Sequence, residues 1–280
     1  MTFFNSNRDV KMPKLIYGTA WKKEETASLV ELAINSGFRG IDTACQPRHY
    51  NEAGVGLGIE RSKIERKELY LQTKFTPFGG QDPDDCPYDP KASIEDQIIT
   101  SLGVSFKNLK TDYLDGLILH SPLSTLSETL RAWQVLESFV NDKKVRQIGI
   151  SNCYDPEFFK EIYLKASIKP SVLQNRFYRD TGFDKELREF CHMEKIIYES
   201  FWTLSHNRDF LETEYILSLA KKYSVTPAVI LYRAVSETGI IPLCGTTSEE
   251  HMKEDLLLEE FNILPEEVDK IMEKLTNLIN

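Results

Sequence analysis

The segment KLIYGTAWKKEETASLVELAINSGF, residues 14–38, contains a strand pattern followed directly by a helix pattern. Residues 14–20 are rich in β-forming side chains and end in small residues, as a short buried strand does. In residues 24–38 the apolar side chains recur at helical spacing, and the pattern closes at Gly37, a common helix stop. The segment therefore predicts one strand followed by one helix.

The same alternation of strand and helix continues to the end of the chain. Helix patterns follow at 93–110 and 126–144, and a third at 155–167 opens with Asp155 as its cap and Pro156 in its first turn. Eight strands, each followed by a helix, is the number found in a closed (β/α)8 barrel. The seven further strands are predicted at residues 38–44, 69–75, 113–121, 145–152, 170–178, 196–204 and 240–245.

A doubly wound sheet is the main alternative to this barrel. Such a sheet normally carries a Gly-rich nucleotide-binding turn after its first strand, but here GTAWKKEE follows that strand and the chain contains no GxGxxG. GVGLG at 54–58 lies within a helix pattern and has the wrong spacing. Since no linker or low-complexity tract divides the chain, we predict that residues 1–280 form one α/β domain, a single (β/α)8 TIM barrel with a short N-terminal hairpin.

Charge and composition limit the partners of the chain. Its 34 Lys and Arg residues face 43 Asp and Glu residues, a net charge of −9, and no basic cluster is present, so nucleic acid and anionic membranes are not expected partners. We find no signal-peptide-like start and no apolar run of about 18 residues, which predicts a cytoplasmic protein. The five cysteines show no CxxC or zinc spacing, so reduced thiols and no metal site are expected.

Polar residues stand at the ends of several otherwise apolar strands. Each has an ordinary structural explanation, such as capping, solvent contact or a hydrogen-bonded histidine. Together, at the barrel face where chemistry collects, they would cost burial energy without a purpose. Tyr50 lies in the loop just after the first of them, and a site at the barrel mouth is predicted. The strand-end residues are Asp42, Lys74, His120, Ser151, Asn152 and Gln174.

These residue types suit one kind of chemistry. A phenol has a pKa of about 10 and donates a proton poorly at neutral pH unless a nearby cation favours the phenolate. Lys74 is placed to supply that charge, and Asp42 to keep Lys74 protonated. A neutral His120 would orient a substrate oxygen. The group would protonate an oxygen while electrons reach the adjoining carbon, which describes carbonyl reduction by hydride transfer.

An ordered set of motifs resembles the aldo-keto reductase family from residue 18 to the helix after residue 248. The resemblance implies a (β/α)8 barrel that reduces small-molecule aldehydes or ketones with NADPH, less often NADH, needs no metal and is monomeric. By position, Asp42, Lys74 and His120 match three of the family's four catalytic residues. The motifs are GFRGIDTA, YNEAGVG, LQTKF, LKTDYLDGLILHSP, KVRQIGISN, PSVLQNRF and IIPLCGTTSEEH.

The resemblance also implies residues that bind cofactor and substrate. Ser151, Asn152 and Gln174 match the residues that hold the nicotinamide carboxamide. Phe201 stands where a tyrosine usually stacks beneath the nicotinamide ring, and Trp21 resembles a tryptophan that lines the substrate pocket.

The adenosine end of the cofactor site departs from the family pattern. The segment LCGTTSEEHMKED has no arginine and places His251 where an arginine that grips the 2′-phosphate of NADPH is common. A 2′-phosphate favours charge-assisted donors. Backbone donors around Gly245 and the hydroxyls of Thr246, Thr247 and Ser248 are left to serve, so we expect NADPH to be preferred and NADH to be possible.

The proton donor is the second departure. The family pattern is YxNE, whereas this chain has HYNE at 49–52, with Tyr50 directly before Asn51. A gapless alignment from residues 55 and 56 places His49 at the catalytic position. Lys74 is suited to lowering the pKa of a phenol and would push an imidazole toward its neutral, non-donating form. We predict that the loop is remodelled so that Tyr50 donates the proton, with His49 as the alternative.

Two other classes of function remain open. One is a cofactor-binding regulatory or sensor subunit on the same barrel, which the irregular HYNE spacing keeps open. The other is a lyase or isomerase that uses Lys74 as a Schiff-base nucleophile, against which Asp42 and the Ser151, Asn152 and Gln174 pattern argue.

Two features bear on the substrate. The loop at 77–93, rich in Pro, Gly and Asp, would form a substrate wall or lid, or else a solvated surface loop. The chain ends soon after an amphipathic helix pattern at 265–280, without a long tail, so an open pocket with broad aldehyde or ketone specificity is expected.

Overall fold

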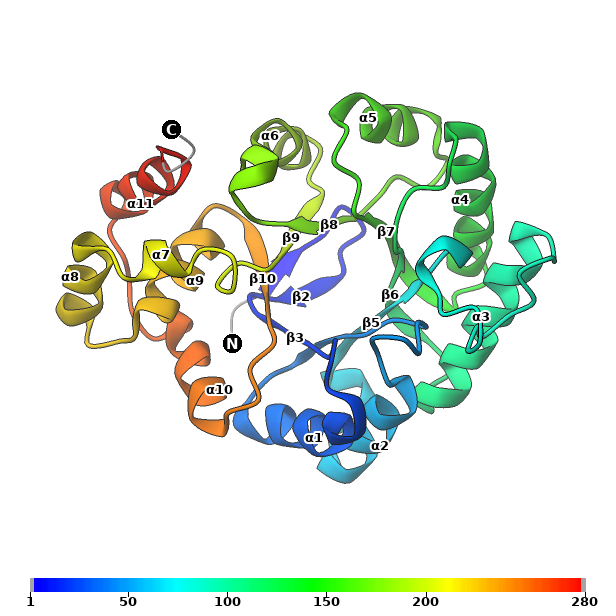
Figure 1. The fold of residues 1–280 in the computed structure, drawn as a ribbon, viewed down its shortest axis with the longest axis horizontal. Helices are drawn as coiled ribbons and strands as arrows, with labels where there is room; N and C mark the ends of the chain where they lie inside the picture. The colour runs from blue at the N-terminus through cyan, green and yellow to red at the C-terminus, as the bar shows by residue number, and fades with distance from the viewer. Residues whose placement is uncertain (1–2, 278–280) are drawn as a thin grey trace.

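A closed barrel of eight parallel strands forms the centre of the molecule. The computed structural model describes residues 3–277. Its strands follow the order β10-β3-β4-β5-β6-β7-β8-β9 around the barrel, which confirms the predicted (β/α)8 fold (Figure 1). The strands are β3 (Ile16–Gly18), β4 (Gly40–Asp42), β5 (Tyr70–Phe75), β6 (Leu114–Leu119), β7 (Val145–Ser151), β8 (Val172–Arg176), β9 (Ile197–Phe201) and β10 (Ile240–Cys244).

Helices lie around the barrel in the view of Figure 1. Within residues 3–277, none of them is long and apolar enough to cross a membrane. They are α1 (Thr26–Ser36), α2 (Glu52–Ser62), α3 (Ile94–Leu109), α4 (Leu126–Asn141), α5 (Pro156–Lys165), α6 (Lys185–Met193), α7 (Arg208–Leu211), α8 (Glu214–Tyr223), α9 (Pro227–Glu237), α10 (Glu249–Leu256) and α11 (Pro265–Asn277).

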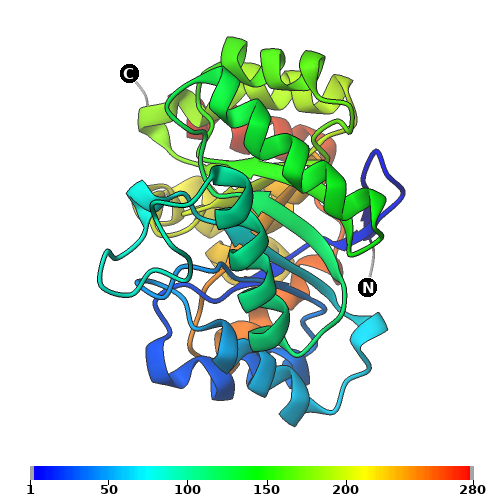
Figure 2. The same cartoon turned by 90° about the vertical axis from the view of Figure 1, so that its right-hand side faces the viewer.

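The predicted N-terminal hairpin is present and lies across one end of the barrel. Strands β1 (Phe3–Asn5) and β2 (Lys11–Pro13) pair antiparallel, with Phe3 opposite Pro13. Figure 2 shows the hairpin at the end of the molecule opposite to the loop at 77–93. Met12 belongs to the same buried cluster as Ile118, so the hairpin closes the N-terminal end with apolar side chains. The other end of the barrel is left for the site.

Local sequence explains where several helices begin. The Asp155 side chain accepts hydrogen bonds from the backbone of residues 157 and 158 at the start of α5, and Thr125 forms a capping box with Glu128 at the start of α4. Asn51 caps α2 in the same way by accepting from the Gly54 backbone, at 2.8 Å. The cap fixes Tyr50 immediately before this helix.

The segment GVGLG lies inside α2, as the sequence predicted, and its glycines serve packing. A Cβ on Gly56 would overlap the backbone carbonyl of Asn108, at the end of α3. Since only glycine permits this approach, the motif brings α2 against α3.

The loop at 77–93 does not form a wall of the cavity at the barrel mouth, because none of its residues lines that cavity. Gln81 donates to the carbonyl oxygens of Cys45 and Thr76, at 2.9 and 3.2 Å, and the Tyr88 hydroxyl donates to Thr76 at 2.7 Å. The Tyr88 ring also lies 5.6 Å from that of Phe75. These buried contacts hold the loop against the end of β5.

Candidate active site

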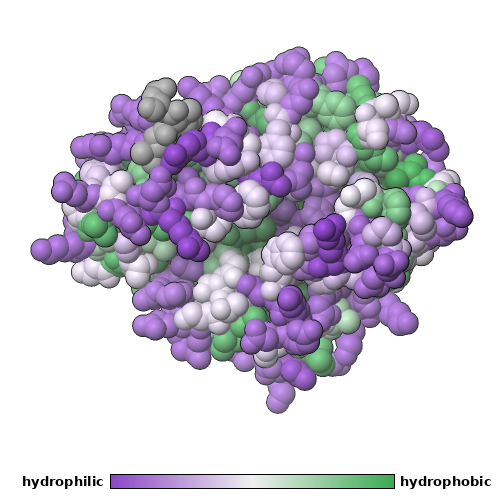
Figure 3. Space-filling view, in the orientation of Figure 1, coloured by the Kyte–Doolittle hydropathy of each residue, from purple (hydrophilic) through white to green (hydrophobic). Residues whose placement is uncertain are grey.

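A cavity of about 960 Å³ opens at the C-terminal ends of the strands. Figure 3 shows it as a central hollow with apolar residues at its base. A second hollow, of about 1180 Å³, lies beside the N-terminal hairpin and is lined by none of the predicted site residues. Of those residues the central cavity brings together Trp21, Asp42, His49, Tyr50, His120, Ser151, Asn152, Gln174, Phe201, Gly245, Thr246 and His251.

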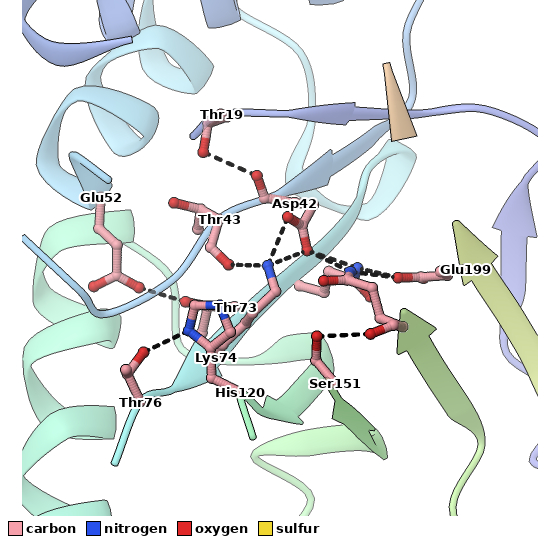
Figure 4. Close-up of polar contacts among 12 residues, drawn as sticks. Thr19, Asp42, Thr43, Glu52, Thr73, Lys74, Thr76, His120, Ser151 and Glu199 are labelled. Atoms are coloured by element: carbon pink, nitrogen blue, oxygen red, sulfur yellow. Dashed lines mark hydrogen bonds and ion pairs between the residues drawn. The ribbon is translucent and has the colours of Figure 1, made fainter. Parts of the chain in front are cut away.

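Three residues named from the sequence do not line this cavity: Thr247, Ser248 and Lys74. The Lys74 side chain is fully buried behind Asp42, and its Nζ lies 2.6 Å from both carboxylate oxygens of Asp42 (Figure 4). The ammonium also donates to the Thr43 carbonyl at 2.9 Å. Burial acts to lower the pKa of Lys74, but the surrounding groups, the Asp42 carboxylate first among them, outweigh burial, so this pKa lies above its usual value. Lys74 is therefore held as a cation.

Tyr50 lies against this cation. The Lys74 Nζ is 5.2 Å from the centre of the Tyr50 ring, and the His120 ring is 6.0 Å from it in an edge-to-face arrangement. Burial raises the pKa of the Tyr50 phenol above its usual value, while the charge of Lys74 acts in the opposite direction. The phenol is thus protonated at neutral pH and stands beside the charge that stabilises its anion.

His49 lies at the rim of the cavity. Its ring is 3.8 Å from the ring of Trp21, and its carbonyl accepts from the Trp21 backbone at 2.7 Å. The two rings are tilted by 34° to each other, and Trp21, on the outer side, is 66% exposed whereas His49 is half-buried. The backbone amides of both His49 and Tyr50 donate to the Gln46 carbonyl, at 3.0 Å. This turn separates the His49 and Tyr50 side chains.

The remainder of the HYNE motif anchors the loop. Glu52 is buried and accepts from the hydroxyls of Thr73 and Ser105, at 2.5 and 2.8 Å. Asn51 is the cap of α2. Glu52 ties the loop to β5 and α3, and Asn51 ties it to the start of α2, so both support the position of Tyr50.

His120, directly after β6, presents one ring nitrogen to Thr76. The Nδ1 atom lies 2.6 Å from the Thr76 hydroxyl. Burial, and then the charges of Lys74 and His49, hold the pKa of His120 well below its usual range. The ring is neutral at neutral pH, and Nε2 is left to interact with a ligand in the cavity.

Replacing Thr76 with valine is expected to lower kcat/KM about tenfold, because one hydrogen bond that orients the His120 ring is lost. Thr76→Ser keeps the hydroxyl and is expected to retain most activity. Steady-state kinetics of the two variants measure the difference. Full activity in Thr76→Val, with a loss only in Thr76→Ser, would mean that the threonine methyl group, and not the hydroxyl, matters.

The amide and hydroxyl groups at the ends of β7 and β8 are already organised. The Ser151 hydroxyl donates to the backbone carbonyl of Gln174 at 2.7 Å, and the side-chain amide of Asn152 donates to the backbone carbonyl of His120 at 2.9 Å. Tyr154 donates in turn to the Asn152 side-chain oxygen, at 3.2 Å. Phe201, the last residue of β9, lines the same cavity with an apolar ring.

The far end of the cavity lies between β10 and α10. The Lys22 ammonium donates to the Gly245 carbonyl, and burial lowers the pKa of Lys22. Ser248 caps α10 by accepting from the His251 backbone, at 3.3 Å. Asp255 accepts from the Cys244 thiol, at 3.0 Å. This end therefore offers the N-terminus of α10 and the basic side chains of Lys22 and His251, with the acidic side chain of Asp255 nearby.

Sequence reasoning missed four residues around the cavity. Thr76 and Arg176 are polar residues at the ends of apolar strands, the same pattern that predicted Lys74 and Gln174. Lys22 follows Trp21 directly. Trp202 follows Phe201, and the Arg176 guanidinium lies 4.4 Å from the centre of its ring. The contact between Arg176 and Trp202 depends on the path of the loop after β9 and has no sequence signal.

The residues fit a nicotinamide dinucleotide. The cavity is lined both by His120, after β6, and by His251, on α10, and its volume of about 960 Å³ is large enough for a ligand of this size. Amide and hydroxyl groups gather beside Phe201, where a carboxamide-bearing ring would need them. In residues 3–277 no group of three metal-ligating side chains is placed to hold a metal ion.

Comparison with known proteins agrees with this geometry. The model of the Aldo/keto reductase family matches residues 14–276. The chain belongs to this family. It is accordingly an NAD(P)H-dependent oxidoreductase that reduces carbonyl groups, and the regulatory alternative is not favoured.

Individual relatives are distant but cover most of the chain. It is 29% identical to the 9,11-endoperoxide prostaglandin H2 reductase of Trypanosoma cruzi, over 98% of this chain and 90% of that protein. It is also 29% identical to the glyoxal reductase of Bacillus subtilis, over 88% and 82%. The crystal structure of an aldo-keto reductase from a Medee basin deep-sea metagenome library superposes with a TM-score of 0.84 at 25% identity, over 98% and 95% of the two chains.

Proposed function

We propose that this aldo-keto reductase reduces small aldehydes and ketones to alcohols, with NADPH as its preferred hydride donor and Tyr50 as its proton donor. The observation that carries the proposal is the placement of the Tyr50 ring against both Lys74 and His120, at 5.2 and 6.0 Å. The His49 ring, by contrast, packs against Trp21, 3.8 Å between ring centres.

The residues divide the work of carbonyl reduction among them. The neutral His120 donates through Nε2 to the substrate oxygen and orients it. Tyr50 gives its proton to that oxygen, and Lys74, held by Asp42, stabilises the phenolate that results. When bound, the reduced nicotinamide supplies the hydride to the carbonyl carbon.

The cofactor is held by the residues at the strand ends. Ser151, Asn152 and Gln174 bind the carboxamide, and Phe201 packs against the ring. Gly245, Thr246, Thr247 and His251 serve the adenosine end. These roles follow the positions that the family resemblance assigned, and all but Thr247 line the cavity.

The test is the decrease in absorbance at 340 nm when purified protein, NADPH or NADH, and a panel of aldehydes and ketones are mixed. Turnover of several unrelated carbonyl compounds is expected, because Trp21, which lines the cavity, is 66% exposed and not packed over it. Tight cofactor binding without turnover of any substrate would contradict the proposal.

We expect NADPH to be favoured over NADH by about tenfold in kcat/KM, the effect of one charge-assisted hydrogen bond to the 2′-phosphate. His251, in the first turn of α10, supplies it, while the neighbouring Glu254 and Asp255 limit the gain. Parallel kinetics with both cofactors give the ratio, and His251→Ala should bring it close to one. A strong preference for NADH would overturn this assignment.

The proposal extends to a cytoplasmic monomer without nucleic-acid or membrane partners. All five cysteines are free thiols, which suits a reducing compartment. The net charge of −9 disfavours polyanionic partners. Light scattering on the purified protein measures its mass, and twice the 32.3 kDa of one chain would contradict the monomer.

A further inference from the structure

Glu199 is a fully buried carboxylate that the proposed mechanism does not use. It lies on β9, inside the barrel, and pairs in register with Gln174 on β8. Asp42 and Gln72 form a second register pair, on β4 and β5. The order of the strands places these two pairs on opposite sides of the barrel. In Figure 4, dashed lines link Asp42 and Glu199 through the hydrogen bonds between the two sides.

The two glutamine amides bridge the two carboxylates. The Gln72 Nε2 atom donates to Asp42 at 2.8 Å and to Glu199 at 2.7 Å. The Gln174 Nε2 atom donates to the same two oxygens, at 3.0 and 2.7 Å. Each amide has two hydrogens, so both are used in each bridge.

This arrangement fixes which way the Gln174 amide faces. Its nitrogen is held between Asp42 and Glu199, so its carbonyl oxygen points away from them. Rotating the amide by half a turn would bring that oxygen against two carboxylate groups, with loss of both hydrogen bonds. Gln174 lines the cavity, whereas Gln72 does not, and the Gln72 oxygen accepts from Tyr70 at 2.7 Å. Gln174 therefore presents an acceptor to the cavity.

Glu199 accepts these bonds in either protonation state. Burial, and then the charge of Asp42, raise the pKa of Glu199 to about 7. The amides both donate to Oε2, while Oε1 has no hydrogen-bond partner within residues 3–277. A proton on Oε1 would leave the Oε2 acceptor unchanged.

We propose that Glu199 is a positioning residue for the cofactor: it holds the Gln174 amide with the oxygen toward the cavity, ready to accept a hydrogen bond from the nicotinamide carboxamide. This inference rests on the proposed function. Glu199 would change cofactor affinity only by orienting Gln174, because Glu199 itself does not contact the ligand.

The test compares Glu199→Leu with Glu199→Gln. The leucine has no acceptor, so the dissociation constant of NADPH, measured by fluorescence titration, is expected to rise about tenfold, the effect of one lost hydrogen bond to a polar group. The glutamine keeps an acceptor oxygen and is expected to stay within about threefold of the wild type. At saturating cofactor, kcat is expected to change little in both variants.

Two controls separate this role from a general effect on folding. Gln174→Leu combined with Glu199→Leu should bind no more weakly than Gln174→Leu alone, because both changes remove the same interaction. Gln72→Leu breaks the other bridge and is expected to lower the melting temperature without weakening NADPH binding. If Glu199→Leu does not fold, Glu199→Met takes its place in both comparisons.

Unchanged affinity in Glu199→Leu would overturn the inference, as would an equal loss in Gln72→Leu or fully additive losses in the double variant. Wild-type protein that neither binds NADPH nor reduces any carbonyl compound would instead remove the proposed function. The wild-type measurement therefore comes first and distinguishes the two failures.

Discussion

Replacing Tyr50 with phenylalanine is expected to lower kcat for aldehyde reduction by about 10²- to 10⁴-fold, the range that general acid catalysis contributes. The change removes only the hydroxyl group and leaves the ring between Lys74 and His120. Cofactor affinity should therefore stay close to that of the wild type. Steady-state kinetics and fluorescence titration on the same preparation measure the two effects.

His49→Ala is the matched control for this variant. His49 packs against Trp21, whereas Tyr50 lies against Lys74, so removal of the His49 ring is expected to change KM through the entrance and to leave kcat within about threefold. Near-complete loss of reduction in His49→Ala, with Tyr50→Phe still active, would reverse the assignment and make His49 the donor.

Replacing Lys74 with methionine has the second large expected effect. The variant leaves Asp42 buried without its cation, and breaking a buried ion pair in this way costs about 3–5 kcal/mol of stability. Reduction should also fall by at least about 10²-fold, because no charge remains to stabilise the phenolate. Urea denaturation and turnover measurements give the two quantities separately.

The double variant Asp42→Asn with Lys74→Met distinguishes the two roles of the pair. A neutral amide has no charge to compensate, so much of the lost stability is expected to return, while reduction remains low. Recovery of both stability and activity would show that Lys74 serves the fold alone and that the proton donor needs no cation.

The barrel and the Asp42–Lys74 pair could be predicted from the sequence, because both follow from the positions of the strands, which the periodic pattern of apolar residues gives. Strand patterns give the barrel, and the barrel places strand ends on one face, where a charge such as Lys74 at the end of β5 is conspicuous. The aldo-keto reductase motifs then supplied roles that spacing alone does not.

The features that sequence reasoning missed depend on contacts between distant segments. The loop at 77–93 is held down by Gln81 and Tyr88, whose partners lie before the loop, and no local pattern announces those bonds. The link between Gln174 and Asp42 crosses the barrel from β8 to β4. In the sequence Glu199 is a single polar residue in an apolar strand, and its role depends on the hydrogen bonds that Gln174 makes across the barrel.

The burial of the cysteines has a consequence for an enzyme that handles aldehydes. Carbonyl compounds of this kind are electrophiles that combine with nucleophilic sulfur, and the thiolate is the reactive form. Burial raises the pKa of both Cys45 and Cys153 to about 12, and four of the five cysteines are inaccessible, with only Cys86 partly exposed. The fold thereby protects most of its own sulfur from covalent damage by the molecules it is proposed to consume.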